Sequence, residues 1–399
     1  MSHYDALETR SADARAADQL AALNVILGRL AEHDGSCLPD VGRLGDLSEL
    51  ARLPVLRKSE LSTWQAEQPP FGGMLVGDVA HVFQSPGPIY EPGGVGQDWW
   101  RFGRFVHALG IGADDIVHNC FGYHLTPAGM MFENAARAVG ARVLPAGTGQ
   151  TELQAQAAAA IGTTAYAGTP DYLKVILEKA DEMGLTLQIT KAAVSGGALF
   201  PQLRAFYEAR GITCRQCYAT ADLGHVAYET PAMEGMVVDE GVIVEIVTPG
   251  TGDPLPPGEV GEVVVTSLNP DYPLIRFATG DMSAVLEGQS PCGRTNMRIK
   301  GWMGRADQTT KIKGMFVRPE QVAALAAKFP EVSRVRVVAG RSGDQDTLKV
   351  RVEGDVGHSD AYAAAVADVL KLRGAVEVVA EGALPKDGVL IEDGRDYAG

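Results

Sequence analysis

Two short segments carry residues whose types and spacing could bind a nucleotide. The first, "YATAD" (Tyr218–Asp222), ends a predicted strand, and side chains there project into the crevice at the carboxyl ends of strands, where ligands bind. The second, "RFATGD" (Arg276–Asp281), is expected to end an apolar run in a turn, and Asp281 could accept hydrogen bonds from ribose hydroxyls. Each acidic residue could instead cap a loop or stabilise a turn, so neither segment identifies a site alone.

A third segment, "HVFQSPGPIYEP" (81–92), has the position of a phosphate-binding loop but an unsuitable composition. We expect a loop there, between a strand and a helix, which is where an α/β protein usually binds phosphate. Its three prolines have no N–H to donate, and Glu91 would repel an anion.

The elements that must position these segments follow from the hydrophobic pattern. Leucines at helical spacing predict a helix within 11–33. From about residue 97 to residue 220, predicted helices and strands alternate, with Thr151 as an expected N-cap, which indicates a mostly parallel sheet flanked by helices. After residue 230 two β-rich runs suggest an antiparallel subdomain, and from about residue 305 a compact α+β pattern begins. We therefore expect an α/β protein with a large domain (1–304) and a small one (305–399).

Composition narrows the class of protein. The chain has 399 residues, 46% hydrophobic and 21% charged, as in a globular protein, and its net charge of −15 argues against binding nucleic acid or an anionic membrane. The sequence contains neither a membrane-length apolar run nor a secretory leader, and its five cysteines suit a reducing compartment, so we expect a cytoplasmic protein.

Common metal and phosphate motifs are missing from the sequence. It contains no Walker loop, no GxGxxG and no HExxH. Cys214 and Cys217 have CxxC spacing, and zinc would need two further ligands, for which Cys292 and His225 are the only tempting residues. Because cysteines in a buried strand usually serve packing, zinc is not expected.

Taken in order, the motifs resemble those of the adenylate-forming superfamily, in particular its phenylacetate–CoA ligase branch. The resemblance covers nearly the whole chain and includes "YATAD" and "LIRFATGD". It extends to further segments: "LPVLRKSEL", "PPFGGML", "DIVHNCFGYHLTPAGM", "TPDYL", "VSGGALFP" and "GRADQTTKIKGMFVRPEQV". It implies that a carboxylate attacks the α-phosphate of ATP, and that CoA then displaces AMP after the small domain rotates.

The resemblance also implies ligands and partners. ATP/AMP, Mg²⁺ and CoA are the expected cofactors, and a small, aromatic carboxylic acid is the expected substrate. A homodimer is compatible with the resemblance.

Residue roles follow from the resemblance, position by position. Tyr218 would stack on adenine beside Ala219 and Thr220, and Asp222 would bind Mg²⁺ in place of the family's Glu. Asp281 would hold the ribose, and Arg305 would contact the ribose or phosphate. The remaining implied residues are the nucleotide-contacting Ser85, Gly87, Gly196 and Gly197, the acid-pocket residues Phe121, Tyr123, His124 and Gly129, the hinge Asp307, and Lys386 as catalytic lysine, with His124 also positioning the carboxylate. For Phe121 and Tyr123, ordinary core packing is the alternative.

The sequence departs from the family at the elements that handle the phosphates. Of the family's Ser-Ser-Gly-Thr-Thr-Gly-Lys-Pro loop, Ser85, Gly87 and Pro92 remain, whereas Glu91 replaces the lysine. This exchange turns an attraction of roughly 4 kcal/mol, for charges about 4 Å apart at an effective dielectric of about 20, into a repulsion. At the C-terminus Val389 occupies the slot of the adenylating lysine, and Lys386, three residues earlier, could replace it or lie on the surface.

Three functions therefore stay open at the level of sequence. The first is an ATP-dependent acid–CoA ligase, and the second is a transferase or condensing enzyme that uses a preformed adenylate or acyl-CoA. The third is a non-catalytic binder of nucleotide or acyl-CoA. The carboxylate of Asp222, together with Tyr218, Asp281 and Arg305, argues against the third, because a binder needs no Mg²⁺ carboxylate.

Overall fold

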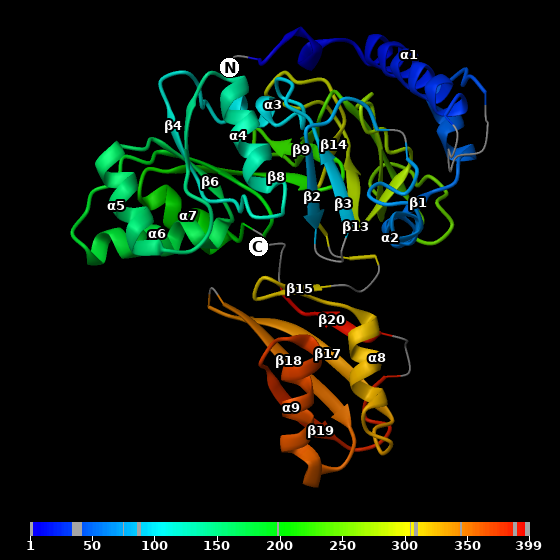
Figure 1. The fold of residues 1–399 in the computed structure, drawn as a ribbon, viewed down its shortest axis with the longest axis vertical. Helices are drawn as coiled ribbons and strands as arrows, with labels where there is room; N and C mark the ends of the chain where they lie inside the picture. Colours follow the sequence, from blue (N-terminus) through cyan, green and yellow to red (C-terminus); the bar gives the residue numbers. More distant parts are fainter. Residues whose placement is uncertain are drawn as a thin grey trace. The chain divides into compact units, whose positions relative to one another are not determined.

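The chain forms two compact units, Met1–Trp302 and Met303–Gly399, in a computed structural model (Figure 1). The structure describes residues 3–33, 42–74, 76–85, 89–197, 199–303, 305–306, 310–343, 345–385 and 389–395, with the backbone alone at Glu320. Each unit has its own hydrophobic core, and the two are described separately below.

The parallel half of the large unit's sheet confirms the predicted β–α alternation. Five strands run side by side in the order β5-β4-β6-β7-β8, all parallel. Their bounds are Ile116–Asn119 (β4), Arg142–Pro145 (β5), Ala165–Gly168 (β6), Lys191–Val194 (β7) and Thr213–Thr220 (β8). The central strands β4, β6 and β7 are mostly buried on both faces, as a sheet covered by helices requires, whereas the edge strand β5 is partly exposed.

Helices cover both faces of this half (Figure 1). The helices α3 (Gly103–Ala108) and α4 (Ala128–Ala138) share a core cluster with Ala165 and Ala167 of β6. Tyr166, which points to the other face, packs with α6 (Pro170–Glu182) and α7 (Pro201–Ala209), and α5 (Thr151–Ile161) packs on α6. The alternation of neighbours along β6 follows from the two-residue period of a strand.

The antiparallel half begins where β8 pairs with β9 in the opposite direction. Its strands are β9 (Gly224–Glu229), β10 (Met236–Val238), β11 (Val242–Val247), β12 (Val260–Ser267), β13 (Phe277–Leu286) and β14 (Arg298–Ile299). The sheet continues in the order β8-β9-β10-β14-β13-β12-β11, and β1 (Leu56–Arg57) pairs with β13. The predicted antiparallel unit is confirmed as the pair β11–β12.

The segment 81–92 differs from its prediction. Instead of a loop between strand and helix, it is a β-hairpin of β2 (His81–Ser85) and β3 (Ile89–Gly93), whose connection lies outside the described residues. The residues Val82, Phe83, Ile89 and Tyr90 favour strand conformation, and α2 (Lys58–Glu67) fixes β3 through two hydrogen bonds between Gln65 and the backbone of Tyr90. Glu91 therefore lies in a strand rather than in a flexible loop.

Two smaller expectations also need correction. Thr151 is the first residue of α5 rather than its N-cap, which is Gln150 in a left-handed conformation. The helix expected after residue 97 is confined to α3, because Asp98 and Arg101 adopt positive φ values of 52° and 68° that interrupt a helix.

The N-terminal segment contains the predicted helix, α1 (Ala12–Ala31), between the short helices η1 (Ala6–Thr9) and η2 (Leu47–Arg52). Buried Arg15 joins α1 to the large unit through Glu240, with Nε 2.9 Å from Oε2. Within the described part of the chain, none of the helices combines the length and apolar character needed to cross a membrane.

The small unit is an α+β module around a four-stranded sheet ordered β19-β18-β17-β20. Its helices α8 and α9 share one apolar cluster with the sheet. The elements are β15 (Thr310–Ile312), β16 (Met315–Val317), α8 (Pro319–Ala327), β17 (Arg334–Ser342), β18 (Gln345–Glu353), η3 (Val356–His358), α9 (Ser359–Leu370), β19 (Ala375–Val379) and β20 (Ile391–Asp393). The short strand β20 was not predicted from the sequence.

Candidate nucleotide and acid site

Irregularities in two strands position the candidate nucleotide residues. The register of β8 against β9 shifts between Tyr218 and Ala219, and β12 shifts against β13 opposite residues 279–281. Asp281 thus lies in a β-bulge rather than in the predicted turn, because Gly280 (φ 72°) adopts a conformation that lets the strand continue. Bulges change the direction of side chains, so Tyr218 and Asp281 do not follow the regular alternation of side chains between the two faces of their strands.

The structure brings Tyr218 and Asp281 into direct contact. The Tyr218 hydroxyl donates a hydrogen bond of 2.8 Å to Oδ2 of Asp281, and the indole Nε1 of Trp302 donates one of 2.9 Å to Oδ1. Asp281 is only 8% exposed, and the Tyr218 hydroxyl and the Trp302 indole orient its carboxylate. A carboxylate held in this way is suited to accept hydrogen bonds from a pair of vicinal hydroxyls.

Curvature of the sheet creates this contact. Strands β8 and β13 are four positions apart in the strand order. They would lie about 19 Å apart in a flat sheet with a strand spacing of about 4.8 Å. The 2.8 Å hydrogen bond between Tyr218 and Asp281 therefore requires the antiparallel half to coil around the site.

Asp222 lies in the turn between β8 and β9, next to a lysine. Lys58 Nζ, at the start of α2, is 2.8 Å from Oδ2 of Asp222, whereas Oδ1 is buried without a hydrogen-bond partner among the described residues. Thr220 stabilises the turn, since its hydroxyl accepts a hydrogen bond from the N–H of Leu223.

Glu91 is buried beside this pair. It is 1% exposed, and neither carboxylate oxygen has a well-formed hydrogen bond within the described part of the chain. Burial and the charge of Asp222 raise the pKa of Glu91 to about 8, against the opposing influence of Ser85 and Lys58. At neutral pH the side chain of Glu91 is therefore mostly protonated and neutral, and it does not exert the repulsion of phosphate expected from an ionised glutamate.

The donors of this cluster suit a hard divalent cation. Both oxygens of Glu91 and Oδ1 of Asp222 are buried without a hydrogen-bond partner among the residues that the structure describes, and oxygen is the ligand that Mg²⁺ prefers. Among the described residues no group of three or more His, Cys, Asp or Glu side chains could hold a metal alone. Mg²⁺ in nucleotide sites commonly binds one or two carboxylates and completes its shell with phosphates and water, so the residues fit this ion.

The acid-pocket segment contains a hydrogen-bonded turn after β4. Asn119 Nδ2 donates to the Tyr123 hydroxyl at 2.7 Å and to the Gly129 carbonyl at 2.8 Å. A Cβ on Gly129 would approach the Tyr123 ring to 2.8 Å and the Gly122 carbonyl to 2.7 Å, so only glycine lets the ring lie against the start of α4. Burial raises the pKa of Tyr123, which keeps its hydroxyl neutral.

The neighbours of Tyr123 have different surroundings. Phe121 is 7% exposed and stacks on Phe132 of α4 with ring centroids 4.3 Å apart, so it belongs to the core cluster. His124 is exposed, and Leu125 next to it accepts a hydrogen bond of 2.9 Å from the N–H of Gln84 in β2. This bond links the acid-pocket segment to the hairpin.

The glycines and small residues expected at the nucleotide lie at strand ends. Gly196 (φ 71°) and Gly197 follow β7, and a Cβ on Gly196 would come no closer than 3.8 Å to Phe121. Ala219 and Thr220 end β8 and are half-buried, and Ser85 ends β2.

Four expected site residues are not placed relative to these. Arg305 belongs to the small unit, whose placement relative to the large unit is not described. Gly87, Asp307 and Lys386 lie outside the described residues.

The cysteines considered for zinc are dispersed. Cys214 and Cys217 lie on opposite faces of β8, in different core clusters, and burial raises the pKa of each to about 12. Buried His225 pairs with Asp239 at 3.5 Å, and the Cys292 sulfur lies 3.0 Å from the Ser290 hydroxyl.

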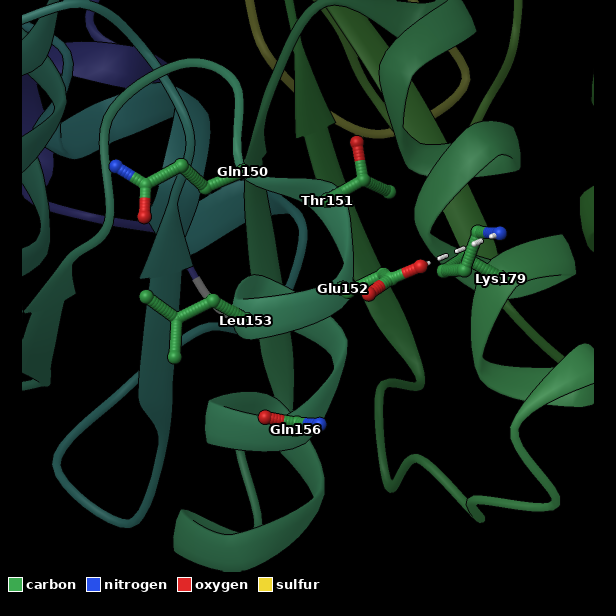
Figure 2. Close-up of a pocket in the computed structure, with 6 residues that line it drawn as sticks. All are labelled: Gln150, Thr151, Glu152, Leu153, Gln156 and Lys179. Atoms are coloured by element: carbon green, nitrogen blue, oxygen red, sulfur yellow. Dashed lines mark ion pairs between the residues drawn. The ribbon is translucent and has the colours of Figure 1, made fainter.

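A separate hollow of about 520 Å³ lies on the surface at the start of α5 (Figure 2). Glu152 and Lys179 form an ion pair of 4.0 Å across it, and the other lining residues are Gln150, Thr151, Leu153 and Gln156. None of these residues belongs to the candidate site.

Sequence reasoning missed Lys58 and Trp302 and did not foresee the burial of Glu91. Lys58 was part of a quoted motif without a role, and Trp302 directly precedes the expected hinge region. Their contacts with Asp222 and Asp281 span 164 and 21 residues, so spacing alone gives no signal.

No family model matches the chain, but the curated relatives named here carry the same name. It is 32% identical over 329 residues to the phenylacetate–coenzyme A ligase of Aromatoleum evansii, covering 78% of this chain and 73% of that protein. It is 30% identical over 334 residues to the enzyme of that name from Escherichia coli K12, covering 77% and 74%.

Among solved structures, a 2-hydroxyisobutyryl-CoA ligase in complex with 2-HIB-AMP and CoA has the same fold. The TM-score is 0.80 at 24% identity, over 98% of this chain and 92% of that chain. An amide bond synthetase, McbA from Marinactinospora thermotolerans, matches with a TM-score of 0.56 at 19% identity, over 78% and 67%. Sequence identity, coverage and fold together show that this chain belongs to the phenylacetate–coenzyme A ligase family of adenylate-forming proteins.

Proposed function

We propose that the protein is an ATP-dependent ligase that converts a small aromatic carboxylic acid into its acyl-adenylate and transfers the acyl group to CoA. Family membership supports this activity, and phenylacetate–CoA ligases are its curated relatives. The observation that carries the proposal is Asp281, oriented by Tyr218 and Trp302 in the curved half of the sheet.

In this proposal the ribose hydroxyls donate to Asp281, and adenine stacks on the ring of Tyr218. The Tyr218 hydroxyl and the Trp302 indole are neutral donors that orient the carboxylate of Asp281, and carboxylate oxygens can each accept more than one hydrogen bond. Holding the ribose in this way fixes the α-phosphate relative to the attacking acid, and such positioning supplies much of the rate in phosphoryl and nucleotidyl transfer.

Asp222 is the proposed ligand of Mg²⁺. When bound, the ion would neutralise charge on the phosphate oxygens during transfer. The chain's own contribution is to bury Asp222 in the β8–β9 turn with one oxygen oriented by Lys58 and the other available.

The acid would bind at the segment after β4. Tyr123, held by Asn119 and packed on Gly129, offers an aromatic wall, which favours an aromatic substrate. Exposed His124 would position the carboxylate, and Phe121 would support the pocket from the core.

The small unit is the proposed lid. Rotation about a hinge near Asp307 would let Arg305 contact the nucleotide and would exchange an adenylation arrangement with Lys386 for one that admits CoA. This assignment follows from the family resemblance of "GRADQTTKIKG" and the C-terminal "LPKDGVL".

Acid-dependent ATP–pyrophosphate exchange across a panel of aryl acids, followed by thioester formation with CoA, tests the proposal. We expect exchange with at least one aryl acid and a CoA thioester of the same acid. Absence of exchange with every acid, together with absence of ATP binding by calorimetry, would contradict an ATP-dependent ligase.

The altered phosphate elements favour one alternative, an acyltransferase that starts from a preformed acyl-adenylate. Prolines in the hairpin connection and Val389 in the lysine slot are the observations behind it. A synthetic aryl-adenylate would then yield the CoA thioester although exchange is absent.

A further inference from the structure

The buried acidic pair Glu91 and Asp222 carries an inference specific to this chain. The two side chains come from different elements, strand β3 and the β8–β9 turn. Helix α2 contacts both elements, because Lys58 pairs with Asp222 and Gln65 bonds the backbone of Tyr90, next to Glu91. Burying a carboxylate without a hydrogen-bonding partner is costly, and proteins retain such groups chiefly where a ligand completes them.

We propose that Glu91 and Asp222 together bind the divalent cation that accompanies the nucleotide phosphates, so that the hairpin holds a metal where the family's loop holds a lysine. This inference rests on the proposed function and deepens it. It turns the Lys-to-Glu exchange at position 91 from a loss of phosphate binding into a change in how positive charge is supplied.

Three observations support the pair as a site. Both oxygens of Glu91 and Oδ1 of Asp222 lack partners among the described residues, and Glu91 and Asp222 are only 1% and 7% exposed. The charge of Asp222 raises the pKa of Glu91, and both carboxylates raise the pKa of buried Tyr272, in each case in addition to the larger effect of burial. Gln65 holds β3 in place through the backbone of Tyr90, so Glu91 is presented by a fixed strand.

Charge arithmetic agrees with this role. With both carboxylates ionised, Glu91, Asp222 and Lys58 sum to −1. A divalent cation brings the sum to +1, the charge that one lysine would offer to the β,γ-phosphates. A metal held by two carboxylates also leaves coordination positions for phosphate oxygens and water, as Mg²⁺ requires.

The test measures Mn²⁺ binding by the loss of the free-ion EPR signal, with Mn²⁺ alone and with Mn²⁺ plus α,β-methylene-ATP, on the full chain. We expect Glu91→Gln and Asp222→Asn each to weaken Mn²⁺ binding by about tenfold or more, because each removes one charged ligand. Glu229→Gln is the matched control: it removes a buried carboxylate that pairs with Arg204 at 2.7 Å, and Mn²⁺ affinity should not change.

The outcomes separate this inference from the proposed ligase activity. Unchanged Mn²⁺ affinity in a folded Glu91→Gln variant, checked by circular dichroism, overturns the inference, even where acid-dependent exchange is present. Loss of Mn²⁺ affinity in both variants supports the site, and it does so also where exchange is absent and the ligase proposal fails. If only Asp222→Asn weakens binding, Glu91 is not a ligand and the inference is wrong.

Discussion

The nucleoside side and the phosphate side of the candidate site differ in how they relate to the family. On the proposed nucleoside side, Tyr218 and Asp281 keep the residue types of the family's motifs and contact each other. On the phosphate side, a lysine has become Glu91 and a second lysine slot holds Val389. The difference suggests that recognition of the nucleoside was kept while the supply of positive charge to the phosphates was rebuilt.

The physics of the two sides explains why one can change and the other cannot. Recognition of a ribose needs hydrogen bonds in a fixed geometry, and the bulge in β13 and the donor Trp302 fix the carboxylate proposed for this role, that of Asp281. Charge neutralisation depends mainly on distance, so a cation can come from a lysine or from a metal ion. Changes to either side therefore give a direct way to test the comparison.

The largest expected effect is that of removing Lys386. If this lysine performs adenylation, the phosphate side keeps one of the family's positive charges, and the contrast between the two sides becomes smaller. If this lysine performs adenylation, Lys386→Ala should slow ATP–pyrophosphate exchange roughly 10²–10³-fold, as the loss of a transition-state charge does. Thioester formation from a synthetic aryl-adenylate should continue and is the control. Unchanged exchange would mean that the phosphate side works without a lysine at this end of the chain.

Asp281→Asn tests whether the nucleoside side of the site depends on the charged carboxylate of Asp281. Loss of the charged acceptor should reduce exchange by roughly hundredfold, or about 3 kcal/mol, because hydrogen bonds to charged groups contribute about 1.5–3 kcal/mol each. The matched control is Asp271→Asn, since Asp271 accepts a similar bond of 3.0 Å from Trp99 Nε1 outside the site. Equal losses in both variants would show a structural rather than a nucleotide-binding effect.

Glu91→Gln probes the phosphate side through the pH dependence of stability. The folded-state pKa of Glu91 is raised to about 8, so ionising the buried group costs stability as the pH rises. With metal removed by EDTA, the stability of the variant relative to the wild type should rise by about 1.4 kcal/mol for each pH unit between about pH 4.5 and pH 8. Denaturant unfolding at several pH values measures this gain.

The same measurements contain their own check. Below about pH 4.5 both proteins carry a neutral group at position 91 and should differ little. A difference that stays constant from pH 4 to pH 9 would contradict the buried, neutral Glu91.

The smallest expected effect is that of Lys58→Met. It removes the partner of Asp222 Oδ2 and should lower the free energy of unfolding by about 1–2 kcal/mol, reduced because the lysine side chain is 38% exposed. Saturating Mn²⁺ should restore part of the loss, because the ion compensates the carboxylates left behind. Thermal unfolding with and without Mn²⁺ measures both effects, and a loss that Mn²⁺ does not reduce would separate Lys58 from the proposed metal site.

Much of the fold and part of the site were accessible from the sequence. Local patterns sufficed for the β–α alternation, the helix α1, the pair β11–β12 and the small α+β unit, because hydrophobic periodicity depends only on neighbours along the chain. The motifs around Tyr218, Asp222 and Asp281 were found through their order and their family resemblance.

The three-dimensional relations required the tertiary structure. That 81–92 is a hairpin depends on pairing in space, and the contacts of Lys58 with Asp222 and of Trp302 with Asp281 depend on sheet curvature and helix packing. The sequence by itself determined which chemical groups this protein carries and in what order. Only the tertiary structure decided that Glu91 is buried beside Asp222, because burial and electrostatic coupling arise between segments that are distant in the chain.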